Sequence, residues 1–407
     1  MEKRLQAFLA LALWLTAQSP KALALEESEG LEILPTQGVS EREILFGQSA
    51  ALSGPAKNLG LDMRSGILAA FHEVNERGGI RGRKLKLVTK DDAYEAVPAK
   101  VNTRHLLTEE KVFAFIGGVG TPTSKAVLPI IAQTPLLYLG PFTGASLLRT
   151  SYLKTVINVR ASYAQETQKM VQHLKNDLNI ERIGVFYQSD SYGRDGFDGV
   201  QKAIDETEGI EIVSSGAYMR NSTAVQSGVL EIHRGNPQAV IIIGSYAPAA
   251  TFIRWVEKLG ILDKSTVFMA VSFVGTSSLA KELQKSESKA NVFATQIVPD
   301  HLSDSKLAKN YTKAMEKIGL DRDTNVVSLE GYVVGRLAAA ALERIEGEIT
   351  HENFSLAFRD HIFDIDGFRL AFDGADDNQG SNEVFFTEIA RGKAYSIETP
   401  LKIREES

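Results

Sequence analysis

The feature that most constrains the fold is a repeated alternation of short apolar runs with amphipathic helical segments. The runs "VFAFIG", "RIGVFYQ" and "AVIIIG" have the length and composition of buried strands. Between such runs, Met63, Ile67, Phe71 and Val74 recur at helical spacing before the glycine pair at 78–79. This alternation is typical of parallel sheets covered by helices on both faces. We count two such units, one on each side of Arg160, and predict an α/β fold with two doubly wound parallel-sheet lobes.

The chain of 407 residues is also too long for one ordinary core, which supports two lobes. We expect the C-terminal part to complete both of them. The predicted first lobe comprises residues 43–160 and 299–366, and the second comprises 161–298 and 367–400. Residues 25–42 are polar with Gly and Pro, so they are expected to form a flexible lead-in.

The N-terminal segment has the layout of a secretory signal peptide. Lys3 and Arg4 precede an apolar run of about 13 residues, Pro20 breaks it, and "ALA" at 22–24 offers a cleavage site. The alternative, a membrane anchor, would need roughly 20 apolar residues. The sequence therefore predicts a signal peptide over residues 1–24. If the source is a bacterium, the mature protein is expected in the periplasm.

Composition narrows the function classes. The net charge of −6 and the pI of about 5.8 give no sign of a nucleic-acid partner. The chain has no cysteine, so the exported protein must be stable through its own core without disulfides.

Residue patterns for catalysis, cofactors and metals are weak. Gly118 and Gly120 follow a predicted strand, but Thr123 stands where a dinucleotide fingerprint needs its third glycine. Ser49 in "GQSAA" lacks the second glycine of a nucleophile elbow. The seven histidines are scattered without metal-ligand spacing. We therefore predict no enzyme activity, no cofactor and no metal.

Neutral hydroxyl groups at strand ends are the better candidates for a site. "GTPTS" and "GPFTGAS" both follow predicted strands, and they place Thr121 and Thr143 beside helix N-termini. Ligands of open α/β sheets bind outside the carboxyl ends of the strands, where free N–H groups accept an anion. The alternative is that both threonines only cap their helices.

Aromatic side chains occupy the same kind of position in the second unit. Tyr192 in "SDSYGRDG" and Tyr246 in "GSYAPAA" both follow apolar strands and precede helices. Both tyrosines could face a cleft. The alternative is that they are ordinary packing residues.

At these residues the sequence resembles the leucine/isoleucine/valine-binding family of periplasmic solute-binding proteins, the receptor subunits of ABC importers. The resemblance extends from about Glu43 to Thr399. The stretches that carry it are "FGQSAALSGPAKNLG", "AAFHEVNERGGIRGRKLKLVTKDDA", "FAFIGGVGTPTSKAVLPI", "LGPFTGASLLR" and "GVFYQSDSYGRDG". It implies two α/β lobes joined by a three-strand hinge that close on a solute.

The resemblance also implies roles for individual residues. Two loops of the first lobe would bind a ligand carboxylate, two tyrosines of the second lobe would line the cleft, and one position would contact the ligand side chain. The two carboxylate-binding loops contain Thr121 in one and Pro141, Phe142 and Thr143 in the other. The two tyrosines are Tyr192 and Tyr246, and the residue that would contact the ligand side chain is Leu59.

Two departures from the family pattern affect the expected ligand. Amino-acid-binding members place an acidic residue after the strand that corresponds to "VFMAV", whereas here Ser272 and Phe273 occupy that region. Phe142 replaces a residue that is usually small. The pocket is therefore expected to hold a free α-amino group poorly and to be more apolar or aromatic.

Together these observations predict a periplasmic, monomeric solute-binding protein of an ABC importer. It would capture a small carboxylate- or amide-bearing solute between its lobes and pass it to a permease in the inner membrane. The alternative is a periplasmic sensing module that signals to a membrane receptor or kinase.

Overall fold

The computed structural model describes residues 32–374, 377–390, 392–397 and 402. The described residues from Pro35 onward belong to one compact unit. The expected signal peptide, residues 1–24, lies outside the described residues. Among the described helices, none has the combination of length and apolar composition that a membrane span requires.

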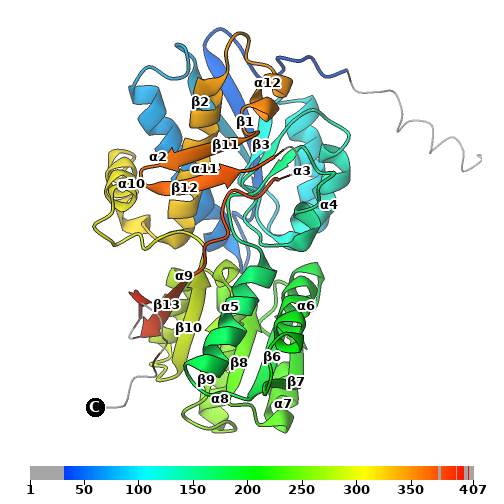
Figure 1. The fold of residues 1–407 in the computed structure, drawn as a ribbon, viewed down its shortest axis with the longest axis vertical. Helices are drawn as coiled ribbons and strands as arrows, with labels where there is room; N and C mark the ends of the chain where they lie inside the picture. The colour runs from blue at the N-terminus through cyan, green and yellow to red at the C-terminus, as the bar shows by residue number, and fades with distance from the viewer. Residues whose placement is uncertain (1–31, 375–376, 391, 398–401, 403–407) are drawn as a thin grey trace, which may run out of the picture. The chain divides into compact units, whose positions relative to one another are not determined.

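The first lobe is built on a five-stranded, all-parallel sheet in the order β2-β1-β3-β4-β5 (Figure 1). In chain order its strands are β1 (Glu43–Ala50), β2 (Lys84–Asp91), β3 (Ala114–Ile116), β4 (Tyr138–Leu139) and β5 (Val156–Ile157). The other elements of this lobe are α2 (Lys57–Glu76), α3 (Ala96–Thr108), α4 (Thr121–Ile131), α10 (Lys306–Lys317), α11 (Val326–Arg344), α12 (His351–Leu356) and the hairpin of β11 (His361–Ile365) and β12 (Phe368–Phe372).

The second lobe has a seven-stranded sheet in the order β14-β13-β10-β9-β8-β6-β7. Its strands are β6 (Arg182–Gln188), β7 (Glu211–Tyr218), β8 (Ala239–Ile243), β9 (Val267–Ala270), β10 (Asn291–Gln296), β13 (Phe385–Ala390) and β14 (Lys393–Ile397). Its helices are α5 (Tyr163–Asn176), α6 (Ser191–Asp205), α7 (Gln226–Gly235), α8 (Tyr246–Leu259) and α9 (Thr276–Lys285). The five strands from β6 to β10 are parallel, as predicted, whereas β13 and β14 add an antiparallel edge.

Glycine allows two helices of the first lobe to pack at very short range. A Cβ atom added at Gly66 of α2 would lie 1.8 Å from the carbonyl oxygen of Ser328 in α11. One added at Gly331 of α11 would lie 2.2 Å from the carbonyl oxygen of Met63 in α2. Real Cβ atoms do not approach backbone so closely, so the spacing of α2 and α11 depends on these glycines.

The chain crosses between the lobes three times, after β5, after β10 and after β12. Two of these crossings are hydrogen-bonded to each other: the Asn158 N–H donates to the Asn378 carbonyl (2.7 Å), and the Gly380 N–H donates to the Asn158 carbonyl (2.8 Å). The last crossing is the dark red segment that descends to β13 in Figure 1.

Two predicted boundaries differ from the structure. We placed residues from 367 onward in the second lobe, but β12 pairs with β11 from Ile365–Phe368 onward and stays with the first lobe. Residues 35–42 are not a flexible lead-in. The Gln37 side chain donates to the carbonyls of Leu107 and Val112 (3.2 and 3.3 Å), and the chain pairs with β1 through Val39.

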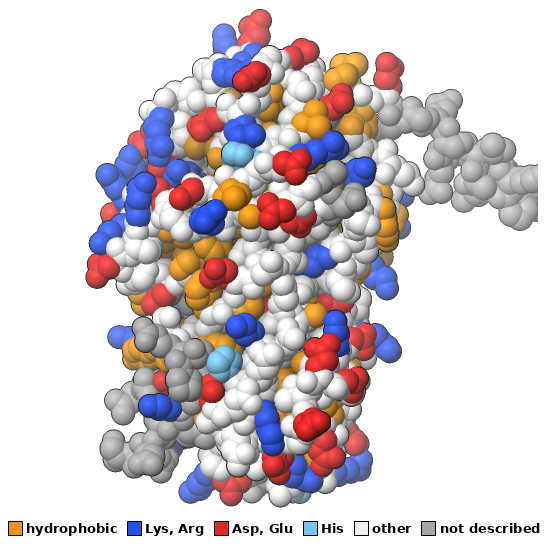
Figure 2. All heavy atoms as spheres, viewed as in Figure 1, with side chains coloured by type: hydrophobic (Ala, Val, Ile, Leu, Met, Phe, Trp, Pro, Cys, Tyr) orange, Lys and Arg blue, Asp and Glu red, His pale blue; other side chains and the backbone are white. Residues whose placement is uncertain are grey.

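Charged side chains of both signs are interspersed on the face of the molecule that Figure 2 shows. The modest net charge of −6 is therefore distributed over this face without a single-sign patch that would dominate the field there.

The glycine contact between α2 and α11 gives a stability prediction. We expect Gly66→Ala to lower the free energy of unfolding by about 1–3 kcal/mol, because the added methyl group forces the helices apart. Urea unfolding measures this change. Ser65→Ala, at the neighbouring half-buried position of α2, removes a hydroxyl that bonds only within its own helix; it is the control and is expected to be nearly neutral. Equal stability of both variants would contradict the packing account.

Candidate functional site

Thr121 and Thr143 meet in the structure. Their Oγ1 atoms are 2.7 Å apart, both side chains are fully buried, and Thr143 Oγ1 donates to the Tyr163 hydroxyl (3.3 Å). Thr121 is the first residue of α4, whose N-cap is Gly120, and no side chain caps this helix. The helix expected after "GPFTGAS" is a single 3₁₀ turn, Ser146–Leu148, which also has no side-chain cap. Neither threonine therefore caps a helix by its side chain, although Thr143 Oγ1 accepts from the Ala145 N–H (3.2 Å) just before the 3₁₀ turn.

The neighbouring strands β3 and β4 explain this meeting. Because they are parallel and paired, their carboxyl ends open at the same edge of the sheet. The loops that follow are tied together: the Phe142 N–H donates to the Gly118 carbonyl (2.8 Å), and the Gly120 N–H donates to the Phe142 carbonyl (3.1 Å). Pro141 is buried in the second of these loops.

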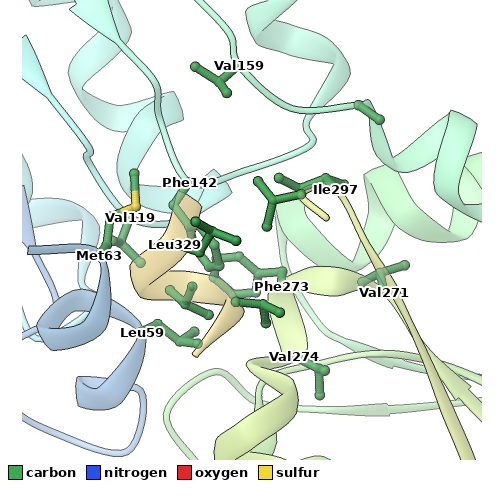
Figure 3. Close-up of a cluster of buried hydrophobic side chains, with 14 of the residues drawn as sticks. Leu59, Met63, Val119, Phe142, Val159, Val271, Phe273, Val274, Ile297 and Leu329 are labelled. Carbon is green, nitrogen blue, oxygen red and sulfur yellow. The ribbon is translucent and has the colours of Figure 1, made fainter. Parts of the chain in front are cut away.

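A cluster of rings from both lobes lies beside the threonines. The Phe273 ring centre is 5.3 Å from that of Phe142, 4.7 Å from that of Tyr192 and 5.8 Å from that of Tyr94. The Tyr192 ring is in turn 5.3 Å from the Tyr163 ring. Figure 3 shows Phe273 reaching from the second lobe towards Phe142. Phe142, Tyr192 and Phe273, all predicted site residues, thus come together, with Tyr94 and Tyr163 in addition.

Leu59 and Tyr246 converge at a different point. Both approach Gly275, where an added Cβ atom would lie 2.5 Å from Leu59 and 3.6 Å from Tyr246. Beside them the Asn58 side-chain amide donates to Ser278 Oγ (3.0 Å), which links the two lobes. All nine predicted site residues are buried or nearly so. Their role in binding a ligand remains a prediction.

Sequence reasoning missed three buried ionisable groups. Arg160 Nη2 donates to Ser272 Oγ and lies 3.8 Å from Glu166 Oε1, and Arg160 Nε lies 3.8 Å from Glu330 Oε1. The guanidinium also lies 4.7 Å from the centre of the Phe142 ring, in cation–π geometry.

The site is consequently not built from uncharged groups alone. We expected the region of Ser272 and Phe273 to lack an acid, but α5 brings Glu166 there. Its carboxylate accepts from the Ser272 N–H (2.8 Å) and hydroxyl (3.0 Å). A signal was present in the sequence: Arg160 ends the apolar run "VINVR", and Glu330 interrupts the apolar helix "VVSLEGYVV".

Burial sets the protonation of these groups. It raises the pKa of Glu330 to about 7, although the Arg160 guanidinium opposes this shift. For Arg160 burial acts to lower the pKa, but Glu330 and Glu166 outweigh it and raise the pKa above its usual value. Arg160 is therefore charged, while Glu330 changes charge near neutral pH.

Comparison with known proteins places the chain in a family. The family model described as periplasmic binding protein matches residues 43–394. The chain belongs to the periplasmic binding protein family. This is a family of binding proteins, so the expectation that the chain is not an enzyme is confirmed. Among the described residues no group of three or more acidic or histidine side chains could hold a metal ion.

Two solved structures resemble the chain closely in fold. A possible leucine/isoleucine/valine-binding protein from Rhodopirellula baltica SH 1 is 38% identical with a TM-score of 0.81, over 90% of this chain and 98% of that one. A solute-binding protein of an ABC transporter from R. palustris, solved with 4-hydroxybenzoate, is 18% identical with a TM-score of 0.76, over 88% of this chain and 96% of that one. These likenesses confirm the predicted fold of two parallel-sheet lobes.

A protein of Pseudomonas aeruginosa named amino acid binding protein is 21% identical over 238 residues. The match covers 58% of this chain and spans 63% of that protein's own length.

Polar contacts at the edge of this binding protein link its two lobes. Arg220 of the second lobe pairs with Glu95 of the first (2.8 Å) and with Asp190 (3.0 Å). The neighbouring Asn221 amide donates to Glu95 Oε1 (2.7 Å) and to the Ala93 carbonyl (3.0 Å). We call Glu95, Asp190, Arg220 and Asn221 the rim cluster.

The rim cluster gives a prediction about closure. We expect Arg220→Gln to shift the equilibrium between closed and open lobes towards the open state. The change in free energy should be no more than about 1 kcal/mol, because these side chains are partly exposed. Since the chain has no cysteine, spin labels at Lys100→Cys and Glu208→Cys can report the distance between lobes. Arg182→Gln, which removes an exposed arginine paired with Glu211, is the control. An unchanged distance distribution in Arg220→Gln would show that the cluster does not hold the lobes together.

The raised pKa of Glu330 gives a pH prediction. The folded protein binds this proton more tightly than the unfolded chain, so stability is lost as pH rises from about 4.5 to about 7. We expect Glu330→Gln to gain stability relative to the wild-type protein between pH 5 and pH 8. Urea unfolding at both pH values tests this, with Glu208→Gln, an exposed carboxyl, as control. The idea fails if the two variants show the same pH dependence.

Proposed function

We propose that this protein captures a small carboxylate- or amide-bearing solute between its lobes and delivers it to an ABC permease in the inner membrane. The observation that carries the proposal is the buried pair of hydroxyl groups, Thr121 and Thr143, at the carboxyl ends of β3 and β4. Hydroxyl groups at this edge of a parallel sheet suit a ligand oxygen, which accepts their hydrogen bonds.

The ring cluster supports a solute with an apolar or aromatic body. Phe142 comes from the first lobe, and Tyr192 and Phe273 come from the second. A solute among these rings is contacted from both lobes only when they are closed. It therefore favours the closed state by the difference in its affinity for the two states.

The relatives are consistent with either an amino acid or an aromatic acid as solute. One is named a possible leucine/isoleucine/valine-binding protein, one an amino acid binding protein, and one was solved with 4-hydroxybenzoate. Periplasmic location accords with the family and with the signal-peptide pattern of residues 1–24. We propose that the solute-loaded protein acts there as a monomer.

A thermal-shift screen over amino acids, carboxylic acids and amides should identify a stabilising solute. With that solute, we expect the double variant Thr121→Val, Thr143→Val to bind about 10–100-fold more weakly, because hydrogen bonds to a charged group contribute about 1.5–3 kcal/mol. Isothermal titration calorimetry measures the loss.

The matched control is Thr108→Val, a hydroxyl at the end of α3 whose hydrogen bonds stay within its own segment. Unchanged affinity in the double variant would remove the two hydroxyls from the binding site.

A further inference from the structure

Arg160 has hydrogen-bond donors that the protein does not use. Its side chain is fully buried, and its Nε and Nη1 atoms have no hydrogen-bond acceptor among the described residues. Only Nη2 donates, to Ser272 Oγ. A buried cation with free N–H groups is costly, and a carboxylate oxygen that accepts from one of these N–H groups would reduce that cost.

The acid beside Arg160 is already occupied. The Glu166 carboxylate accepts from the Ser272 N–H, the Ser272 hydroxyl and the Thr295 hydroxyl, and it faces the Arg160 guanidinium at 3.8 Å. An ammonium group would have to displace one of these donors. It would also lie close to the guanidinium, and like charges at such a distance repel strongly in a buried site.

Arg160 and the threonine pair border the same loop. The guanidinium covers the Phe142 ring at 4.7 Å, and Thr143 is the next residue along the chain. Thr143 also donates to the Tyr163 hydroxyl, a group whose electrostatic influence reaches Arg160. The Phe273 ring of the second lobe packs beside this loop, 5.3 Å from Phe142.

We propose that Arg160 binds the carboxylate of the solute, and that the solute is a carboxylic acid with an apolar or aromatic body and no ammonium group. This inference rests on the proposed function and narrows it, because it selects acids over both amides and amino acids. Arg160 is assigned as the residue that determines this selection.

Glu330 is the group that could oppose an incoming anion, since its Oε1 lies 3.8 Å from Arg160 Nε. Burial raises the pKa of this carboxyl to about 7, so it takes up a proton readily near neutral pH. The other charged or titratable groups that act on Arg160 and Glu330 are Glu166, Arg149, Tyr163 and Tyr192. A protonated Glu330 does not repel a carboxylate.

The test uses matched solutes that share one apolar body and differ in their polar groups: a carboxylate, a neutral amide, or a carboxylate with an ammonium group. The first set is 3-phenylpropionate, 3-phenylpropionamide and phenylalanine, and the second is 4-methylpentanoate, 4-methylpentanamide and leucine. Calorimetric titration of the mature wild-type protein is expected to show that an acid binds at least about 100-fold more tightly than its amide and its amino acid.

Variants of Arg160 test whether this residue causes the preference for the acid. Arg160→Gln is expected to weaken binding of the acid about 100-fold and to leave the amide within about threefold, so that the preference disappears. Arg160→Lys keeps the charge and is expected to retain part of the preference. Arg182→Gln, an exposed arginine, is the control. Because the preference is a ratio measured on one folded sample, a loss of stability alone does not change it.

The outcomes separate this inference from the proposed function. Tighter binding of phenylalanine or leucine than of the matched acid overturns the inference and leaves the proposed function standing. Equal binding of acid and amide, or an acid preference that survives in Arg160→Gln, overturns it as well. If no solute of any class binds, both proposals are wrong.

Discussion

The guanidinium of Arg160 is buried at the first crossing between the lobes, and groups from both lobes hold it. Glu166 and Ser272 belong to the second lobe, whereas Glu330 and Phe142 belong to the first. A lone buried charge would be very unfavourable, so its partners must be in place together. The charge balance of the site therefore depends on how the lobes are arranged. Closure of the lobes and the electrostatics of the site are coupled in this protein.

The two lobes contribute different kinds of side chain to the site around Arg160. The hydroxyl groups of Thr121 and Thr143 come from adjacent strand ends of one sheet, and their positions are fixed by the pairing of β3 with β4. The second lobe contributes Tyr192 and Phe273, which lie at helix starts after the strands of the other sheet. Fixed polar donors on one side and broad apolar rings on the other can orient a small solute. They also exclude water from the site, and the exclusion of water strengthens each polar contact.

Much of the fold could be predicted because the apolar residues of strands and helices recur at a short, local spacing in the sequence. The order of the elements follows from that spacing, and the meeting of Thr121 with Thr143 follows from neighbouring parallel strands. The boundary near residue 367 was wrong because it cut a hairpin. Asp366 and Gly367 both have positive φ (54° and 98°), and an Asp-Gly pair between apolar runs is itself a hairpin signal. The contact of Arg160 with Ser272 has no such signature, because the two residues are 112 positions apart.

The turn that carries Tyr94 shows how local strain serves the contact between lobes. Ala93 and Tyr94 both adopt positive φ (50° and 62°), which costs about 1–2 kcal/mol for each residue. Asp91 and Asp92 offset part of this cost by accepting from the N–H groups of Ala93 and Tyr94 (both 2.9 Å). The strained turn directs the Ala93 carbonyl to Asn221 and the Tyr94 ring to Phe273, both in the other lobe. Because these contacts join the two lobes, they contribute to the stability of the turn only while the lobes are together.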